Sequence, residues 1–283
     1  MKTVRLLYPD YLGGNLEEYY LGSSLMAHII PENPRQKLVR VEIAPPDGRE
    51  RTVSGGIYAR EEIIAGIKDA MAKLESESPD RIITAGGDCL VSLAPFDYLH
   101  GKSGRTGIIW IDAHPDVSTP ADGYPNSHAM VLGSLLGGGD GELSGLLRNG
   151  FFSSDEVLYV GLQGLHDYQA RFLDRAGVKY KIQDRDFVTD SEILDFTGRF
   201  DSILVHFDID VLDERTFHST YFANPELSGD GSGGGRMTID RLSGIISLIS
   251  STGKITGLTI AEYLPFEELR LRKMFSQMEI FRN

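Results

Sequence analysis

Two short stretches of the sequence place acidic and imidazole side chains at spacings that suit metal coordination. Asp112, His114 and Asp116 alternate along DAHPD, and Asp208 and Asp210 alternate in FDID. Each stretch follows an apolar run typical of a buried strand, and alternate residues of a strand point to the same face. In open parallel sheets, sites form at the carboxyl ends of the strands. The spacing therefore predicts one cluster of five potential ligands.

The charge of this cluster indicates the kind of partner it needs. Carboxylates held together away from water repel one another, so they require a compensating positive charge. A divalent cation supplies that charge, and four aspartates with one imidazole favour manganese or magnesium over zinc or copper(I). Bridging carboxylates would allow two ions about 3.5–4 Å apart. A polar loop after each strand is the alternative, and the presence of two clusters favours the metal.

The only cysteine of the chain, Cys89, follows a third strand-like run within AGGDC. A single cysteine forms no intramolecular disulfide, so this thiol is a buried apolar group, a nucleophile or a metal ligand. Asp88 beside it is expected to cap the next helix or to brace its loop. His206, two residues before Asp208, is expected to be packed in the sheet, and we leave it outside the predicted site.

The elements that must position these residues follow a βα rhythm. Short apolar runs alternate with longer segments of helical spacing, which predicts an α/β domain with a parallel sheet. We expect strands at residues 4–8, 38–43, 81–85, 107–111, 156–160, 202–207 and 255–260. We expect helices at residues 59–74, 167–176, 191–196, 239–249 and 266–280. No repeat or linker divides the chain, so residues 1–283 are predicted to form a single domain.

Composition excludes several classes of protein. The 283 residues, 41% of them hydrophobic, suffice for a substantial core. A net charge of −13, without a cluster of lysine and arginine, argues against nucleic-acid binding. No apolar run is long enough to cross a bilayer and no signal peptide is apparent, so we expect no membrane partner and a cytoplasmic location. Residues 224–235, which include a glycine-rich run, are expected to form a mobile lid.

Several motifs, in chain order, resemble those of the ureohydrolase family, which comprises arginases, agmatinases, guanidino-acid hydrolases and formimidoylglutamases. DAHPD at 112–116 is similar to the family's DAHxD, and FDIDVLD at 207–213 is similar to its FDxDxxDP. NSHAM at 126–130 and LLG at 135–137 resemble its NxHGMP and LLG stretch. GLTIAEYLP at 257–265 resembles the segment ending in the family's glutamate. The resemblance covers residues 86–265.

This resemblance implies an arginase-like three-layer α/β/α sandwich with a central parallel sheet and two manganese ions bridged by a hydroxide. The ligands that it implies by position are Asp112, His114, Asp116, Asp208 and Asp210, of which Asp112 and Asp208 would bridge both ions. The family motif GGDH supplies a histidine as the partner of Asp116, and Cys89 stands in its place. A thiolate is a softer donor than an imidazole. We expect Cys89 to coordinate or to lie close to an ion, and one or two Mn²⁺ per chain.

The implied reaction is hydrolysis of a guanidino or amidino C–N bond, in which metal-bound hydroxide attacks the guanidinium carbon. It releases urea or a urea derivative and an amine. Glu262 would pair with the guanidinium of the substrate. His128 would shuttle a proton toward the departing amine. Without the resemblance, we would interpret His128 as an exposed loop histidine. For Glu262 the alternative is a surface residue at a strand end, and its position after the apolar run 257–261 disfavours that alternative.

The sequence is compatible with several guanidino substrates. In arginases, an asparagine and an aspartate hold the α-amino and α-carboxylate groups, and the aligned residues here are Ser118 and His166. Asn126 is a further candidate contact. Departure from histidine at Cys89 also occurs in a hydroxyarginine-hydrolysing branch, so N-hydroxyarginine, arginine and agmatine are all candidate substrates. The resemblance further implies a homo-oligomer, a trimer or a hexamer.

The sequence is also compatible with two other functions. One is a non-catalytic or metal-impaired binding protein with the arginase fold, in which Cys89 has spoiled the metal centre. The other is a deacetylase-like amidohydrolase with a single metal ion, since that group has a related fold.

Overall fold

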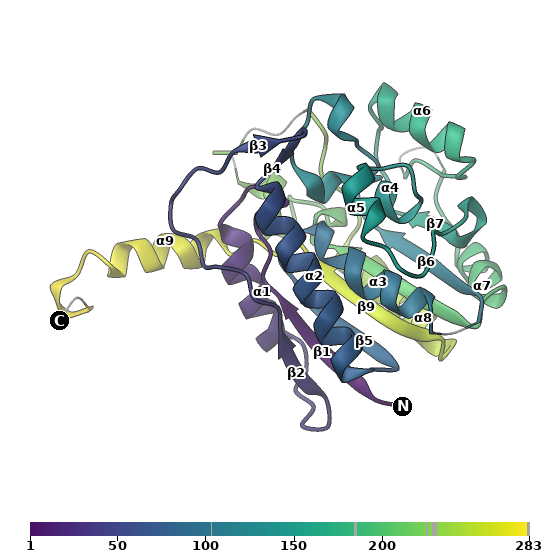
Figure 1. The fold of residues 1–283 in the computed structure, drawn as a ribbon, viewed down its shortest axis with the longest axis horizontal. Helices are drawn as coiled ribbons and strands as arrows, with labels where there is room; N and C mark the ends of the chain where they lie inside the picture. Colours follow the sequence, from purple (N-terminus) through teal and green to yellow (C-terminus); the bar gives the residue numbers. More distant parts are fainter. Residues whose placement is uncertain (103, 184–185, 225, 228–230, 282–283) are drawn as a thin grey trace.

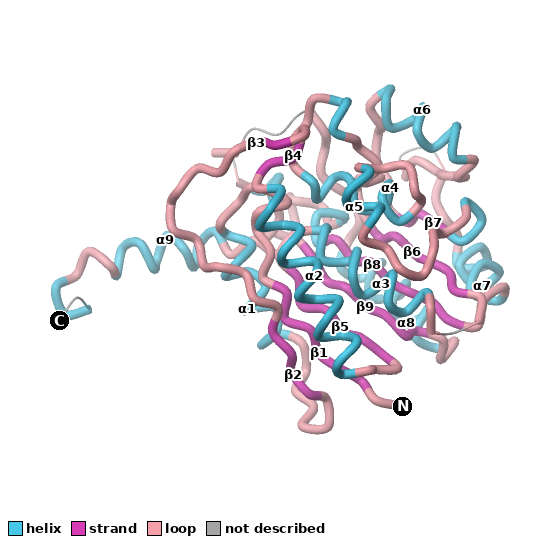
Figure 2. Tube along the Cα trace, in the orientation of Figure 1, coloured by secondary structure: helices cyan, strands magenta, loops and turns pink. Residues whose placement is uncertain are grey.

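The computed structural model describes residues 1–102, 104–183, 186–224, 226–227 and 231–281. A seven-stranded sheet runs through the middle of the molecule in the order β2-β1-β5-β9-β8-β6-β7 (Figures 1 and 2). Every pair of neighbouring strands in this sheet is parallel. The strands are β1 (Thr3–Tyr8), β2 (Lys37–Arg40), β5 (Arg81–Gly86), β6 (Thr106–Ile111), β7 (Val157–Val160), β8 (Ser202–Asp208) and β9 (Ile255–Ala261).

Helices cover both faces of the sheet, and the apolar side chains of single strands divide between these faces. From β6, Ile108 and Trp110 pack into the core beneath α2 (Arg60–Glu77) and α3 (Leu93–His100). Ile109 and Ile111 pack on the opposite face against α7 (Asp190–Gly198) and α8 (Ile239–Ser251). The predicted three-layer α/β/α sandwich with a central parallel sheet is confirmed.

All seven strands were predicted. The central strands, such as β6 and β8, are buried on both faces and read as apolar runs. The edge strand β2 is mostly exposed, and it was recognised only from the short apolar run that begins at Leu38. The hairpin of β3 (Val53–Ser54) and β4 (Ile57–Tyr58) was missed, since strands of two residues carry no periodicity. The five predicted helices are present as α2, α6 (Asp167–Ala176), α7, α8 and α9 (Phe266–Phe275). The last of them ends five residues before position 280, where the side chains are exposed and have no core to contact.

The sequence pattern missed α1 (Glu18–Ile29), α3, α4 (Val131–Leu135) and α5 (Gly141–Gly145). In α1 the buried face consists of Tyr19, Gly22, Ser23 and Met26, which is too polar and too small to read as an apolar stripe. Gly22 is required there, because a Cβ atom would lie 1.9 Å from the carbonyl oxygen of Tyr263. Within the described residues, no helix combines the length and the apolar character needed to span a bilayer.

Four strands end in the same kind of turn. In each, an aspartate side chain after or at the end of the strand accepts a hydrogen bond from the backbone N–H two residues later, which reverses the chain locally. The pairs, with their distances, are Asp10–Leu12 (3.0 Å), Asp88–Leu90 (3.0 Å), Asp112–His114 (2.6 Å) and Asp208–Asp210 (2.6 Å). The ligand residues therefore come together through turns. The expectation that strand alternation continues through residues 112–116 was wrong, because β6 ends at Ile111.

Gly87 connects the ends of β1, β5 and β9, and its replacement by alanine tests how tightly these ends pack. Its N–H donates to the Tyr8 carbonyl and its own carbonyl accepts from the Glu262 N–H. A Cβ atom here would lie 1.6 Å from the carbonyl oxygen of Asp10. We expect Gly87→Ala to lower the free energy of unfolding by about 1–3 kcal/mol or more in denaturant titrations.

The matched control is Gly244→Ala on the exposed side of α8, where nothing lies within 4 Å of the added Cβ atom. This change should leave stability unchanged or raise it by about 0.5–1 kcal/mol, because alanine favours helix. Equal stability of the two variants would contradict the packing described here.

Candidate metal centre and active site

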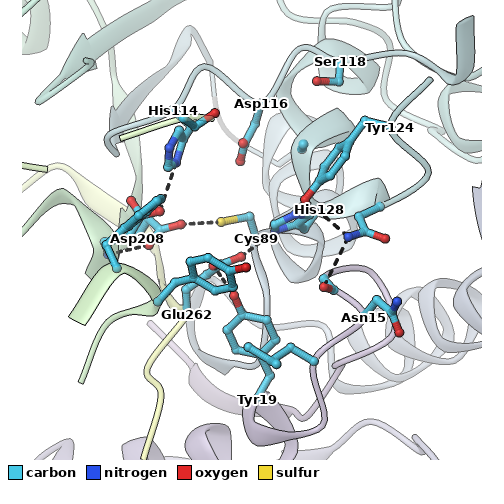
Figure 3. A pocket seen from close by; sticks show the side chains of 18 of the residues that line it. Asn15, Tyr19, Cys89, His114, Asp116, Ser118, Tyr124, His128, Asp208 and Glu262 are labelled. Atoms are coloured by element: carbon cyan, nitrogen blue, oxygen red, sulfur yellow. Dashed lines mark hydrogen bonds and ion pairs between the residues drawn. The ribbon is translucent and has the colours of Figure 1, made fainter. Parts of the chain in front are cut away.

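A buried cavity of about 250 Å³ opens at the carboxyl ends of the central strands. Figure 3 shows Cys89, Asp116, Asp208, Glu262 and other side chains converging on it. These residues follow β5, β6, β8 and β9, so four strands that are distant in sequence each deliver an ionisable group. The parallel sheet brings these strand ends to one edge, as the sequence predicted.

The first group of potential ligands consists of Asp112, His114 and Asp210. Their ligand atoms lie within 4.8 Å of one another. His114 Nδ1 is 3.0 Å from Asp210 Oδ2 and 3.6 Å from Asp112 Oδ1. Two carboxylates and one imidazole therefore face a common point, which is an arrangement suited to a divalent cation.

The second group forms around Cys89, which is 1% exposed. Its thiol donates a hydrogen bond to Asp208 Oδ2 at 2.8 Å. The sulfur lies within 4.8 Å of potential ligand atoms of Asp208 and Glu262, and also of Asp112, Asp116 and His206. The sulfur thus lies among the carboxylates, close to the ligand cluster as the sequence predicted.

Burial makes these groups resist carrying negative charge. Burial, reinforced by neighbouring carboxylates, raises the pKa of Asp112 and of Asp208 well above the ordinary range. Burial also raises the pKa of Asp116 to about 7, although nearby histidines oppose the shift. Burial and then Asp208 raise the pKa of the Cys89 thiol, which keeps it protonated in the ion-free protein.

His114 compensates part of the negative charge at Asp112 and Asp210. Burial lowers the pKa of this imidazole, but Asp210 and then Asp112 outweigh the effect and raise it to about 10. For Asp210, burial acts to raise the pKa, whereas the charge and hydrogen bond of His114 bring it below the ordinary value. One imidazolium cannot neutralise the whole cluster, so the donors fit a divalent cation.

Two buried polar atoms point to the same conclusion. Within the described part of the chain, Asp116 Oδ2 and His206 Nε2 have no hydrogen-bond partner. Buried polar atoms are ordinarily satisfied, and an ion is one of the reasons for an exception. The donor set of oxygen, nitrogen and sulfur atoms fits a metal, and it leaves the identity of the metal open.

Glu262 and His128 form a hydrogen-bonded chain on the other side of the cavity. His128 Nδ1 is 2.8 Å from Glu262 Oε1, and the Tyr19 hydroxyl donates to Glu262 Oε2. His128 Nε2 is 3.1 Å from the Tyr124 hydroxyl. Burial lowers the pKa of His128, but Tyr124 and then Glu262 outweigh it and raise the pKa well above its usual value.

Tyr19 and Tyr124 were absent from the predicted site. Tyr19 comes from α1, whose aromatic residues read as ordinary core, and Tyr124 lies in a loop beside Pro125. The sequence offered only one signal for Tyr124, its spacing of four residues from His128.

The backbone is unusual at three cavity residues. Asn15, Asp116 and Glu262 have φ angles of 53°, 50° and 64°, a left-handed conformation that costs energy for residues other than glycine. All three line the cavity. The fold thus imposes an energetically costly backbone conformation at residues whose side chains line the cavity.

Comparison with known proteins decides the family. The model of the arginase family matches residues 35–271. The chain belongs to the arginase family. An arginase from Entamoeba histolytica is 26% identical over 156 residues, which make up 52% of this chain and 52% of that protein. The chain therefore aligns with about half the length of this curated relative.

Solved structures of arginase-family proteins share the fold. The crystal structure of Entamoeba histolytica arginase with L-ornithine superposes with a TM-score of 0.77 at 19% identity, covering 93% of this chain and 92% of that one. Formimidoylglutamase from Bacillus subtilis gives a TM-score of 0.67 at 14% identity, covering 93% of this chain and 79% of that one.

The structure of this arginase-family chain places two of the three candidate substrate contacts on the cavity. Ser118 lines it and is buried, with its hydroxyl 3.3 Å from that of Tyr168. Asn126 lines it with Nδ2 3.3 Å from the Tyr124 hydroxyl. Both side chains are thus available to a ligand in the cavity.

His166 lies one step away from the cavity. Its Nε2 is 3.2 Å from the hydroxyl of Ser232, which does line the cavity, and its backbone N–H donates to Gln169, another lining residue. Of the predicted lid, residue 225 and residues 228–230 lie outside the described residues. Leu227 and Ser232, on either side of residues 228–230, contribute to the cavity wall.

Replacing Asp116 by asparagine should stabilise the metal-free protein increasingly as the pH rises from about 4 to about 7. The folded protein retains a proton on Asp116 up to a pKa of about 7, whereas the unfolded chain releases it near pH 4. The unfolded state binds fewer protons in this window, so stability falls as the pH rises, and asparagine removes this loss. The expected gain is about 1–3 kcal/mol near neutral pH.

Thermal unfolding with a chelator, compared at about pH 4.5 and about pH 7.5, measures this difference. Added divalent metal should reverse it, because the wild type would then gain more from binding than the variant. A difference between the two proteins that is independent of pH would contradict the assignment.

Proposed function

We propose that the chain is a manganese-dependent hydrolase that cleaves a guanidino or amidino C–N bond, releasing urea or a urea derivative and an amine. One observation carries the proposal: in a member of the arginase family, carboxylates from separate strands converge on one buried cavity. The residues that would hold one or two Mn²⁺ ions are Cys89, Asp112, His114, Asp116, Asp208 and Asp210. A divalent cation there would acidify a coordinated water and polarise the substrate.

Glu262 is the proposed partner of the substrate's guanidinium. Its carboxylate is 3% exposed, lies on the cavity wall and is held from both sides by His128 and Tyr19. A carboxylate fixed in this way presents its remaining lone pairs to a planar cation, which favours a charge-assisted, bidentate contact. Tyr19 orients this carboxylate, because its hydroxyl donates to Oε2.

His128 is the proposed proton donor to the departing amine. It lies between Glu262 and Tyr124, and its raised pKa keeps the imidazole protonated near neutral pH. A protonated imidazole within reach of the cavity can donate its proton as the C–N bond breaks. The negative charge of Glu262, 2.8 Å away, stabilises the protonated form of His128 before the transfer.

The cavity favours a cationic substrate. Among the described residues that line it, the ionisable side chains are acids, histidines, tyrosines and one cysteine, without lysine or arginine. A guanidinium or amidinium is therefore attracted to the carboxylates. Ser118, Asn126 and Gln169 offer neutral polar partners to the rest of the substrate. N-hydroxyarginine, arginine and agmatine are the candidate substrates.

Three further parts of the proposal rest on the family resemblance and the composition. They are a single domain over residues 1–283, a homo-oligomer of three or six chains, and a cytoplasmic location. Each stays a prediction.

The proposal predicts that the chelator-treated protein, reloaded with Mn²⁺, releases urea or a substituted urea from at least one compound in a panel. The panel contains N-hydroxyarginine, arginine, agmatine and shorter guanidino acids. Product formation, measured by mass spectrometry, should disappear with chelator and return with metal.

The outcomes separate the alternatives. Metal bound without turnover of any guanidine would favour the binding protein. A single zinc ion per chain together with cleavage of acetylated amines would favour the deacetylase-like amidohydrolase. Either result would reject the proposed reaction.

His128→Asn should lower kcat by about 10²–10⁴, with little effect on metal stoichiometry, because a general acid is lost while the proposed ligands remain. In the wild type, activity should fall on the alkaline side as His128 loses its proton, above the ordinary pKa of histidine. This alkaline limb should be absent in the variant.

The matched control is His28→Asn, at the exposed C-terminal end of α1. It should retain wild-type kcat and the wild-type pH profile. An equal loss in both variants would contradict a role for His128 in proton transfer.

A further inference from the structure

His206 lies directly behind the ligand cluster and has no assigned role. It is on β8, two residues before Asp208 and thus on the same face of the strand, and it is 0% exposed. Its ring stacks on Trp110, with centroids 3.7 Å apart and planes 10° from parallel. This packing fixes the orientation of the imidazole.

The two nitrogen atoms of the His206 ring have different surroundings. Nδ1 is 2.8 Å from the hydroxyl of Ser92, whereas Nε2 is buried and has no hydrogen-bond partner within the described residues. The nearest acidic atom to Nε2 is Asp112 Oδ2 at 3.7 Å, and that oxygen already accepts a hydrogen bond from Trp110 Nε1. A proton on Nδ1, donated to Ser92, leaves the Nε2 lone pair facing the cluster.

In that tautomer two lone pairs, on His206 Nε2 and Asp112 Oδ2, face each other across 3.7 Å. Two donors bound to one ion at about 2.0–2.2 Å lie about 3.3–3.7 Å apart, so the gap has the size that a shared cation fills. The ligand atoms of Cys89, Asp112, Asp116 and His206 all lie within 4.8 Å of one another. Asp116 Oδ2 is the second buried atom of this group without a partner.

We propose that His206 Nε2 is a metal ligand, and that with Cys89, Asp112 and Asp116 it forms a mixed nitrogen, sulfur and oxygen site. The neighbouring Asp112, His114 and Asp210 group lacks sulfur, so the two halves of the centre differ in donor softness. A site with thiolate and imidazole donors binds Co²⁺ more tightly than Mn²⁺, so Co²⁺ can replace Mn²⁺ there as a spectroscopic probe. The inference deepens the proposed function, since it rests on metal binding at the same centre.

Binding at this site releases the protons that its acidic groups hold in the ion-free protein. In the ion-free protein the Cys89 thiol donates to Asp208. Coordination converts the thiol to a thiolate and releases its proton to solvent, while the neutral His206 ring gives up none. The imidazole is neutral near pH 7, because burial lowers its pKa to about 3.

Titration of metal-free protein with Co²⁺ tests the inference without any substrate. We expect one equivalent of cobalt to give a thiolate-to-cobalt charge-transfer band and the intense visible absorption of a four-coordinate ion. Cys89→Ser should abolish the charge-transfer band. His206→Ala should weaken the binding of this equivalent by about 100-fold or more and should alter the visible bands.

His100→Ala is the matched control. This imidazole also stacks on an aromatic ring, Phe152, at 4.0 Å, and its Nδ1 is also buried without a partner in the described chain. It lies at the C-terminal end of α3, away from the ligand group. The cobalt spectrum and affinity of this variant should match those of the wild type.

A folded His206→Ala protein that keeps the wild-type spectrum and affinity would overturn the inference. If this variant does not fold, Ser92→Ala decides, because it retains the ring and removes only the partner of Nδ1. We then expect a 10–100-fold loss of cobalt affinity, and unchanged affinity would overturn the inference. Cobalt binding as described, without hydrolysis of any guanidine, would instead reject only the proposed function.

Discussion

Repulsion between buried carboxylates is the constraint on which this structure depends. Five strands adjacent in the sheet, β1, β5, β9, β8 and β6, each end in or are followed closely by an acid. These acids are Asp10, Asp88, Glu262, Asp208 and Asp112, and all are buried. Their repulsion is tolerable only where a proton, an imidazolium or a metal ion intervenes.

The two ends of this row of acids solve the problem differently. At Asp10 and Asp88, burial raises both pKa values, that of Asp10 to about 6, and backbone N–H groups provide the hydrogen bonds. At Asp112 and Asp208 the same kind of turn leaves the second carboxylate oxygen facing Trp110 or Cys89. The first pair braces the loops behind the cavity, and the second pair holds the centre of the proposed metal site.

The sequence predicted the sheet well because its central strands are buried on both faces and read as uninterrupted apolar runs. It also brought Cys89, Asp112 and Asp208 to one edge, since parallel strands end together. It failed where single residues depart from a periodic pattern. Residues 112–116 turn away from the strand, and Asp116 and Glu262 adopt positive φ angles that no pattern of residue types reveals.

Other parts of the site were beyond sequence reasoning for a different reason. Tyr19 and His206 are residue types that usually pack in a core, and only their position in space shows that they contact Glu262 or face Asp112. His166 was predicted to contact the substrate, but its side chain reaches Ser232 and does not line the cavity. Loop conformation decides whether a side chain lines the cavity or only contacts a lining residue, and the residue types of a loop do not reveal its conformation.

The stack of Trp110 on His206 has an optical consequence. Trp110 is the single tryptophan of the chain, and its indole touches His206 on one face while its N–H contacts Asp112. Any event that alters the electronic state of that imidazole or carboxylate is transmitted to the only indole fluorophore present. The unlabelled protein therefore carries its own emission reporter at the centre of the ligand cluster.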